Sequence, residues 1–221
     1  MKPNRIGLFG GTFNPIHSGH VLAAAHVFKR MELSKILFIP SFIPPHKAEA
    51  DVVEPGHRLE MVRLAVDDYP EFEVSSLEID ARGTSYSILT LEKVRKNNPR
   101  AELFFILGID AFLEIKTWKE YERLLGQCSF VVMSRPGYHL PNAQGVLGED
   151  FEGGLINFDN LSKDEILNTN RARIILISIP LVDVSSTKVR ECLARRLSVG
   201  GMIPAAVEDY IRTNKLYQGE P

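Results

Sequence analysis

Short apolar runs alternate along the chain with stretches in which apolar residues recur at helical spacing. Apolar runs of roughly four to eight residues are typical of strands buried on both faces, and a recurrence of about 3.6 residues is typical of an amphipathic helix. Strands that alternate with helices through short connections predict an α/β fold, a Rossmann-like open parallel sheet with helices on both faces. The predicted strands are 6–9, 35–40, 71–79, 103–108, 129–133 and 173–179, and the predicted helices are 21–31, 57–66, 85–94, 118–125, 187–197 and 205–215.

One stretch, residues 136–170, departs from this alternation because it is rich in Gly, Asn, Asp and Pro and has weak periodicity. A connection of this length seldom lacks structure of its own, so we expect a surface excursion with a short helix near 163–167. The stretch does not divide the chain. Residues 1–221 are predicted to form a single domain that ends in closing helices at about 187–215.

Composition narrows the class of protein. Of the 221 residues, 44% are hydrophobic and 24% charged, which is typical of a soluble globular protein, and the net charge of −2 gives no general attraction to nucleic acid or to an anionic membrane. The first apolar run is too short for a signal peptide or for a membrane span of about 20 residues, so we expect a cytoplasmic protein with neither partner. Cys128 and Cys192 lack metal-ligand spacing and predict ordinary thiols and no metal site. The sequence does not decide between a monomer and a homo-oligomer.

The segment from Gly10 to His20 follows the first predicted strand and has the sequence Gly-Gly-Thr-Phe-Asn-Pro-Ile-His-Ser-Gly-His. Glycines at the carboxyl end of a parallel strand let backbone N–H groups approach a phosphate, and a helix beginning at Ser18 or Gly19 directs its dipole to the same place. The segment fits neither the Walker pattern nor the dinucleotide fingerprint. His17 lies three residues before His20, so both rings can donate to one phosphate. The alternative is that one ring caps the helix and the other fills a gap.

A second polar cluster follows the last predicted strand. Ser185 or Ser186 is a natural N-cap for the next helix, and Arg190 lies one turn further on, on the same face as Ser186 and Thr187. Hydroxyl groups, N–H groups and a guanidinium in one place predict a phosphate site. An ordinary capped helix with a solvated Arg has the same pattern and is the alternative.

These two clusters resemble the His-x-Gly-His and Ser-Ser/Thr-x-x-Arg elements of the nucleotidylyltransferase superfamily. Lys47 follows Pro44-Pro45-His46 in a loop stiffened by proline, where it is either a turn lysine or a phosphate ligand. The adenylyltransferases that form dinucleotides have a similar Pro-x-His-Lys stretch. Arg-Gly-Thr-Ser-Tyr-Ser at 82–87, Gly-Ile-Asp at 108–110 and Trp118 are similar to features of bacterial nicotinate mononucleotide adenylyltransferases. The resemblance covers almost the whole chain.

The resemblance implies an enzyme that transfers the adenylyl group of ATP to nicotinate mononucleotide and releases pyrophosphate, with Mg²⁺ carried by the ATP phosphates. It also implies that an aromatic side chain stacks on the pyridine ring of the acceptor. The implied catalytic residues are His17, His20, Lys47 and Arg190. The implied ATP-binding residues are Gly10, Gly11, Thr12, Phe13, Gly19, Gly108, Asp110, Arg135, Ser186 and Thr187, and the implied acceptor-binding residues are Thr84, Ser85, Tyr86, Ser87 and the stacking Trp118.

Three positions depart from the bacterial family. Asn14 replaces the usual Asp and keeps hydrogen bonding without the charge, Ser87 replaces the usual Thr, and Leu89 stands where Asp is common. The last two changes concern the acceptor pocket, so a preference for nicotinamide mononucleotide is an alternative to a preference for nicotinate mononucleotide. Phosphopantetheine as acceptor and a non-catalytic nucleotide-sensing module are the remaining alternatives. For single residues, Trp118 in the core and Asp110 as a helix cap are the alternatives.

Overall fold

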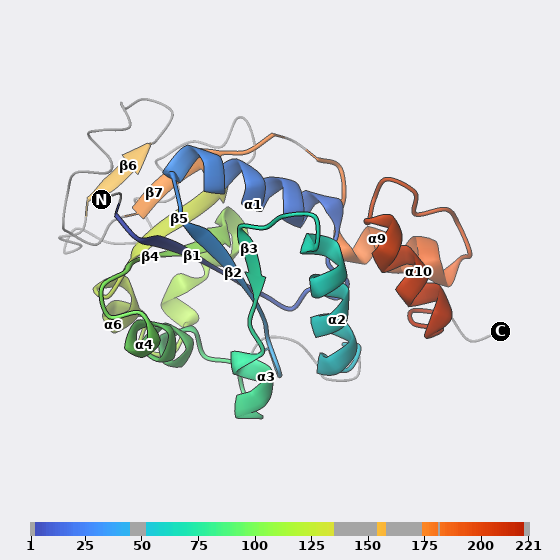
Figure 1. Ribbon diagram of the computed structural model, residues 1–221, viewed down its shortest axis with the longest axis horizontal. Coiled ribbons are helices and arrows are strands. Elements are labelled where there is room, and N and C mark those ends of the chain that lie inside the picture. Colours follow the sequence, from blue (N-terminus) through green and yellow to red (C-terminus); the bar gives the residue numbers. More distant parts are fainter. Residues whose placement is uncertain (1–2, 45–51, 135–153, 158–173, 181, 219–221) are drawn as a thin grey trace. The chain divides into compact units, whose positions relative to one another are not determined.

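The computed structural model describes residues 3–44, 52–134, 154–157, 174–180 and 182–218. Within these ranges seven strands form one sheet in the order β3-β2-β1-β4-β5-β7-β6 (Figure 1). The pairings β1–β4, β4–β5, β5–β7 and β6–β7 are all parallel, which confirms the predicted α/β class with an open parallel sheet. The pattern did not predict β6. The strands are β1 (Arg5–Gly11), β2 (Lys35–Pro40), β3 (Phe72–Val74), β4 (Glu102–Gly108), β5 (Ser129–Ser134), β6 (Leu155–Asn157) and β7 (Ile174–Ser178).

Helices follow the strands in the predicted alternation, and the first begins at Ser18, as expected from the sequence. The predicted helices 57–66, 187–197 and 205–215 are confirmed within a few residues of their ends. In the described part of the chain, no helix is both long and apolar enough to cross a bilayer. The helices are α1 (Ser18–Met31), α2 (Pro55–Val66), α3 (Leu77–Ala81), α4 (Ser87–Asn97), α5 (Ile109–Leu113), a 3₁₀ turn (Ile115–Thr117), α6 (Tyr121–Leu125), α9 (Ser186–Ala194) and α10 (Ala205–Thr213).

The chain divides into two compact units that alternate along the sequence. The elements β1, α1 and β2 each pass from one unit into the other, so neither unit is a continuous piece of chain. The prediction of a single domain stays a prediction. Unit 1 comprises Met1–Gly10, Ala25–Ile36 and Tyr86–Leu181, and unit 2 comprises Gly11–Ala24, Leu37–Ser85 and Val182–Pro221.

In unit 1 the central strands are apolar and buried. The Phe105 ring on β4 lies 5.5 Å from the Phe130 ring on β5. Because β1 and β4 pair in parallel, Gly10 and Gly108 leave the sheet at the same edge. The strand order places β2 on one side of β1 and β4 on the other, and open α/β sheets bind ligands at such a switch point. The β1–β4 register runs from Arg5↔Glu102 to Phe9↔Ile106.

In unit 2 aromatic rings form much of the core. The Phe38 ring on β2 lies 5.3 Å from Phe72 on β3 and 6.0 Å from Phe13, which follows β1. Helix α10 packs against α2, and the Tyr210 hydroxyl lies 2.9 Å from His57 Nδ1 across that contact. This core holds the loop after β1 and the two closing helices within one unit.

The predicted strand 71–79 is wrong beyond its first part. Strand β3 covers only Phe72–Val74, and Leu77–Ala81 form the helix α3. Apolar residues alternate loosely here, but Glu78 and Asp80 occupy the first turn of α3, where negative charge stabilises the start of a helix. The apolar pattern fits either a strand or a helix at 77–81, and the acidic residues in the first turn favour the helix.

The predicted helix 85–94 begins later than expected, and Thr84 and Ser85 do not cap it. Helix α4 begins at Ser87, and Tyr86 occupies the N-cap without a side-chain cap bond. The reason is that the Ser85 hydroxyl is engaged elsewhere, as an acceptor from the Phe42 N–H at 2.9 Å.

The predicted helix 118–125 is likewise shorter. Trp118 ends the 3₁₀ turn Ile115–Thr117 in an extended conformation, and α6 begins at Tyr121. Asp110 is not a cap, because Gly108 holds that position and Asp110 lies in the first turn of α5. The predicted helix near 163–167 lies outside the described residues.

Candidate active site

The glycine-histidine loop, residues 11–20, opens unit 2 and has a fixed conformation. Phe13 has a φ of 48°, a left-handed value that a bulky residue rarely adopts. Its ring lies against Gly11, where an added Cβ would meet the ring at 3.0 Å. The Gly11 carbonyl accepts the Ser41 N–H at 2.9 Å, which ties the loop to the end of β2. A side chain at position 11 would therefore press on the Phe13 ring.

The two predicted histidines stack on each other. The His17 and His20 rings have centroids 3.6 Å apart and an interplanar angle of 25°. The His17 N–H donates to His20 Nδ1 at 3.2 Å, so the neutral His20 ring has its proton on Nε2. This geometry confirms that the pair shares one face, as the spacing of three residues predicts.

His17 is the more buried of the pair, with only 8% of its surface exposed. Burial lowers the pKa of His17 to about 4, so its ring is neutral at neutral pH. Its Nδ1 has no hydrogen-bond partner among the described residues. Buried polar atoms are nearly always paired, and an unpaired one at a glycine-rich loop is typical of a ligand site.

Gly19, between the two histidines, allows a close approach. A Cβ at this position would lie 3.0 Å from Val184 Cγ1 and 3.1 Å from His17 Nδ1. The neighbouring Ser18 is used structurally: its N–H donates to the Met202 carbonyl at 2.9 Å and its hydroxyl to the Gly201 carbonyl at 3.1 Å. The Ser18 N–H is therefore not available to donate to a phosphate. This differs from the expectation that the free N–H groups at the start of α1 are directed at the ligand.

Helix α9 holds the same loop from the other side of unit 2. Ser185 is its N-cap and accepts the Lys188 N–H at 3.1 Å, as predicted. The Ser186 hydroxyl donates to the Pro15 carbonyl at 2.8 Å. Arg190 Nη1 donates to the Asn14 carbonyl at 2.8 Å, and its Nη2 lies 3.5 Å from Thr187 Oγ1. The two motifs predicted from opposite ends of the chain thus meet in unit 2.

The structure adds Arg58, which was not among the residues predicted from the sequence. This arginine on α2 has no exposed surface, and it donates to the carbonyls of Val53 at 2.8 Å, Thr12 at 2.8 Å and Phe42 at 2.9 Å. Burial lowers its pKa to about 10, so it stays charged at neutral pH. It fixes the loop after β1 to the segments that flank the Lys47 loop. A signal existed: Arg58 falls on the apolar stripe of the helix, where a charged residue is uncommon.

The predicted acceptor residues fall into both units. In unit 2, Thr84 pairs with Ile43 as an isolated parallel bridge, and the Ser85 N–H donates to the Ile43 carbonyl at 3.0 Å. Thr84 is exposed and the Ser85 hydroxyl accepts the Phe42 N–H. A hydroxyl that accepts one hydrogen bond keeps its own proton, so Ser85 can still donate to a carboxylate, and its role at the acceptor stays a prediction.

In unit 1, the acceptor residues are aromatic and partly exposed. Trp118 makes an edge contact with Phe105, with centroids 6.0 Å apart, and is half-buried rather than a core residue. Lys119 places its Nζ 4.6 Å from the centroid of the Tyr86 ring, a cation–π contact that the sequence analysis missed. Ser87 is the first residue of α4, directly after Tyr86. Positive charge and aromatic surface thus occur together in this unit.

Comparison with known proteins identifies the family. The chain matches the cytidylyltransferase-like family over residues 8–192. It is 37% identical to a probable nicotinate-nucleotide adenylyltransferase of Moorella thermoacetica, over 98% of this chain and 93% of that protein, and 38% identical to one of Desulfatibacillum aliphaticivorans, over 96% and 99%. This chain belongs to the nicotinate-nucleotide adenylyltransferases.

The nicotinate-nucleotide adenylyltransferase fold is also found among solved structures. The nicotinic acid mononucleotide adenylyltransferase of Plasmodium falciparum, solved with NaAD, covers 97% of each chain with a TM-score of 0.72 at 19% identity. The protein of the same name solved with APC has a TM-score of 0.69 at 18% identity. These matches concern the fold alone. They confirm the predicted fold class, and the sequence relatives confirm the predicted family and enzyme class.

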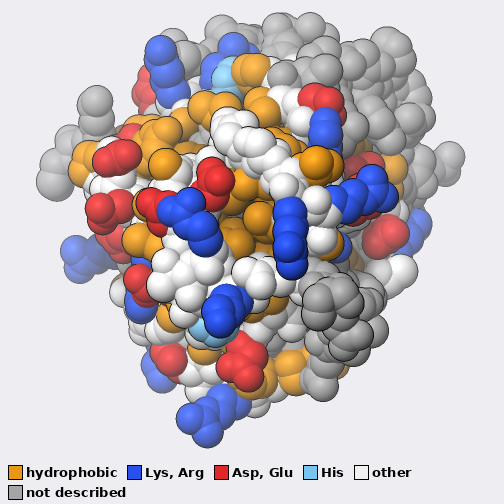
Figure 2. Space-filling model, turned by 90° about the vertical axis from the view of Figure 1, so that its right-hand side faces the viewer, with side chains coloured by type: hydrophobic (Ala, Val, Ile, Leu, Met, Phe, Trp, Pro, Cys, Tyr) orange, Lys and Arg blue, Asp and Glu red, His pale blue; other side chains and the backbone are white. Residues whose placement is uncertain are grey.

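Two residues assigned to phosphates of this adenylyltransferase, Lys47 and Arg135, lie outside the described residues, as does most of 136–170. On the face in Figure 2, Lys and Arg side chains lie beside hydrophobic surface and are interspersed with Asp and Glu side chains. Within the described ranges, no group of three His, Cys, Asp or Glu residues is placed to hold a metal ion. Cys128 is buried and, like Cys192, is not in a disulfide.

Proposed function

We propose that this chain transfers the adenylyl group of ATP to nicotinate mononucleotide, giving nicotinate adenine dinucleotide and pyrophosphate. The strongest support is in unit 2, where two stacked histidines and the Arg190 guanidinium are fixed to one glycine-rich loop. The acceptor follows from the family, since both relatives with 37% and 38% identity are named for nicotinate nucleotide.

The reaction depends more on the alignment of its two substrates than on general acid–base catalysis. An oxygen of the acceptor phosphate attacks the α-phosphorus of ATP, and the bond from that phosphorus to the β-phosphate oxygen breaks, so that pyrophosphate leaves with the electron pair. The second pKa of a phosphate monoester is about 6, so the attacking oxygen is largely ionised and no general base is required. The protein has to align the phosphates and stabilise their charge.

Unit 2 supplies the groups for this task. The His20 ring has its proton on Nε2 and can donate to a phosphate oxygen, because its Nδ1 accepts from the backbone. A phosphate beside His17 would raise its pKa and give its unpaired Nδ1 a partner. Arg190 adds a permanent positive charge, and the N-terminal dipole of α9 acts in the same sense. We assign Lys47 the same role.

The remaining ATP residues are assigned by position. Gly10 and Gly108, at one edge of the sheet in unit 1, let the nucleotide approach the backbone, as Gly11, Thr12, Phe13 and Gly19 do in the loop of unit 2. Asp110 is exposed in the first turn of α5, where its carboxylate can accept from a ribose or adenine group. Arg135 is also assigned to ATP, as are Ser186 and Thr187 of unit 2.

The acceptor is proposed to lie against Trp118, whose half-buried ring can stack on the pyridine. Lys119 follows it directly and holds its ammonium group over Tyr86. A cation at this place would favour the carboxylate of nicotinate over the neutral amide of nicotinamide, which supports nicotinate mononucleotide as the acceptor despite the changes at Ser87 and Leu89.

Mg²⁺ fits this site as a companion of ATP and not as a resident of the protein. The side chains assigned to phosphates in unit 2 are nitrogen donors and hydroxyls, whereas Mg²⁺ prefers carboxylate, phosphate and water oxygens. ATP phosphates and water would therefore hold the ion, which would neutralise charge on the leaving pyrophosphate. The residues of the chain would bind the phosphate oxygens that the ion leaves free.

The test is pyrophosphate release from ATP and Mg²⁺ with nicotinate mononucleotide, nicotinamide mononucleotide or phosphopantetheine as acceptor. We expect the highest kcat/KM with nicotinate mononucleotide. A higher value with either other acceptor would reject the assigned substrate. ATP binding without turnover of any acceptor would instead support the nucleotide-sensing module.

A further inference from the structure

The last described segment of the chain, after α10, turns back on itself. Lys215 and Tyr217 both have left-handed φ angles, 53° and 58°. Such a conformation is uncommon for a bulky residue, so it persists only where surrounding contacts hold it. The Leu216 N–H donates to the Ile211 carbonyl at 3.0 Å, which fixes the turn to the end of α10.

The turn places the Tyr217 hydroxyl at the glycine-histidine loop. This hydroxyl donates to Asn14 Oδ1 at 2.8 Å, and the same oxygen accepts the Val53 N–H at 3.2 Å. Asn14 is only 4% exposed, and its backbone carbonyl accepts from Arg190 Nη1 at 2.8 Å. Asn14 therefore connects the end of the chain, the segment before α2 and the guanidinium assigned to the phosphates.

The electrostatic surroundings keep Tyr217 a neutral donor. Burial raises the pKa of its hydroxyl, and the positive charges of Arg58 and Arg190 only partly oppose this rise. The hydroxyl thus stays protonated at neutral pH and keeps its bond to Asn14. Its bond to Asn14, whose backbone carbonyl is bound by Arg190, joins the segment after α10 to the loop network in unit 2.

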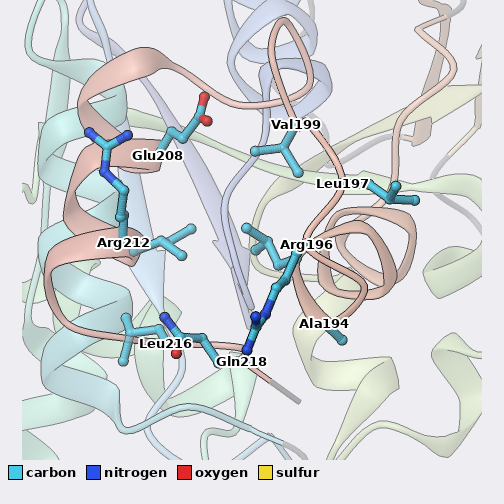
Figure 3. Close-up of a pocket in the computed structure, with 10 residues that line it drawn as sticks. Ala194, Arg196, Leu197, Val199, Glu208, Arg212, Leu216 and Gln218 are labelled. Atoms are coloured by element: carbon cyan, nitrogen blue, oxygen red, sulfur yellow. The ribbon is translucent and has the colours of Figure 1, made fainter. Parts of the chain in front are cut away.

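The neighbours of Tyr217 face another way. Leu216 and Gln218 line a cavity of about 370 Å³ between α9 and α10, together with Leu193 and Ile211 (Figure 3). Tyr217 is not among the residues that line this cavity. The two neighbours seat the turn on the closing helices, whereas the tyrosine between them is directed to Asn14.

From this geometry we propose that Tyr217 is a positioning residue for the phosphate end of the site, acting through Asn14 on the glycine-histidine loop and on Arg190. The inference rests on the proposed function in taking ATP as the ligand of that loop. It gives the end of the chain a role in nucleotide binding, and it explains how Asn14 can act without the negative charge of the Asp that is usual in the family. A neutral amide oxygen suffices to receive two neutral donors.

The test compares Tyr217→Phe with Tyr210→Phe. Both changes remove one hydroxyl from the C-terminal part of unit 2, but the Tyr210 hydroxyl bonds to His57 on α2 and not to a residue of the loop. We expect Tyr217→Phe to weaken ATP binding, measured by calorimetry with ATP alone, by about tenfold, the effect of one lost hydrogen bond. Tyr210→Phe should stay within about twofold of the unchanged protein. In turnover, kcat/KM for ATP should fall with Tyr217→Phe and KM for the acceptor should not change.

A pair of changes at Asn14 makes the test independent of how Tyr217→Phe folds. Asn14→Asp keeps an oxygen acceptor for Tyr217 and should retain ATP affinity, whereas Asn14→Ala should lose about as much as Tyr217→Phe. Unchanged affinity in Tyr217→Phe and Asn14→Ala, or an equal loss in Tyr210→Phe, would overturn the proposal. Because ATP binding is measured without acceptor, failure to turn over nicotinate mononucleotide would refute the reaction and leave this test intact.

Discussion

Units 1 and 2 differ in how firmly they hold the residues assigned to the reaction. In unit 2, the Ser186 hydroxyl and the Arg190 guanidinium are each bonded to the backbone of the glycine-histidine loop. Arg58 fixes the same loop through three carbonyls without any exposed surface. Groups that stabilise transition-state charge act best when their orientation is fixed before the reaction, since no energy is then spent on reorienting them. Unit 2 is built in this way.

In the described part of unit 1, the assigned side chains are held by ring contacts and not by hydrogen bonds to the backbone of a loop. Trp118 is half-buried with an edge contact to Phe105, and Asp110 is exposed. Lys119 is exposed too and lies over the Tyr86 ring. Exposed aromatic and charged side chains can move when a ligand arrives. Changes in unit 2 should therefore affect phosphate chemistry with every acceptor, and changes in unit 1 should affect which acceptor is used.

The largest effect is expected for Arg190→Ala. Loss of a fixed group that stabilises developing charge typically lowers kcat by about 100- to 1000-fold, and the Asn14 carbonyl loses its donor as well. Arg190→Lys keeps the charge without the planar fork and should restore only part of the rate. Lys188→Ala, on the same helix, breaks an exposed ion pair with Asp183 and should stay within about twofold. Equal losses in steady-state rate for Arg190→Ala and Lys188→Ala would contradict the role of Arg190.

Acid stability is the next test of unit 2. The pKa of His17 is lowered to about 4 in the folded protein against an ordinary 6.5, so between these values the unfolded chain binds the additional proton. The stabilisation is complete above about pH 6.5 and is lost as the pH falls through 4, by about 3 kcal/mol in all. Urea unfolding between pH 4 and 7 measures it. His17→Gln should flatten the dependence; parallel curves for the two proteins would show that burial of His17 is not the cause.

A smaller effect is expected for Gly19→Ala, which tests how closely the loop is packed. The added Cβ would press on Val184 and on His17, both about 3 Å away, and should lower kcat by about tenfold or more. Gly56→Ala is the matched control, because Gly56 also lies in the first turn of a helix but has nothing within 4 Å of the added carbon. There the rate should not change, and alanine should raise the melting temperature slightly. Similar rates in the two variants would mean that the space around Gly19 is immaterial.

The same contrast between units explains what the sequence could predict. The strand β4 and the start of α1 follow from local patterns of apolar residues and glycines, and both motifs assigned to phosphates are recognisable as short segments. The bond between Tyr217 and Asn14 joins positions 203 apart, and no periodicity reports such a pairing. One indication of the buried Arg58 was present in the sequence, which is its position on the apolar stripe of α2. Side chains that act through distant partners are therefore the part that the sequence did not reveal.

The smallest effect is expected in unit 1, and it bears on selectivity rather than on rate. If the Lys119 ammonium group favours the carboxylate of nicotinate, Lys119→Ala should lower kcat/KM for nicotinate mononucleotide by about fivefold and leave the value for nicotinamide mononucleotide unchanged, because an exposed charge contributes up to about 1 kcal/mol. Lys116→Ala, an exposed lysine in the preceding 3₁₀ turn, should change neither. An equal fall with both acceptors would mean that Lys119 supports the Tyr86 ring instead of reading the carboxylate. Trp118 would then be the one residue of unit 1 still proposed to determine which acceptor is used.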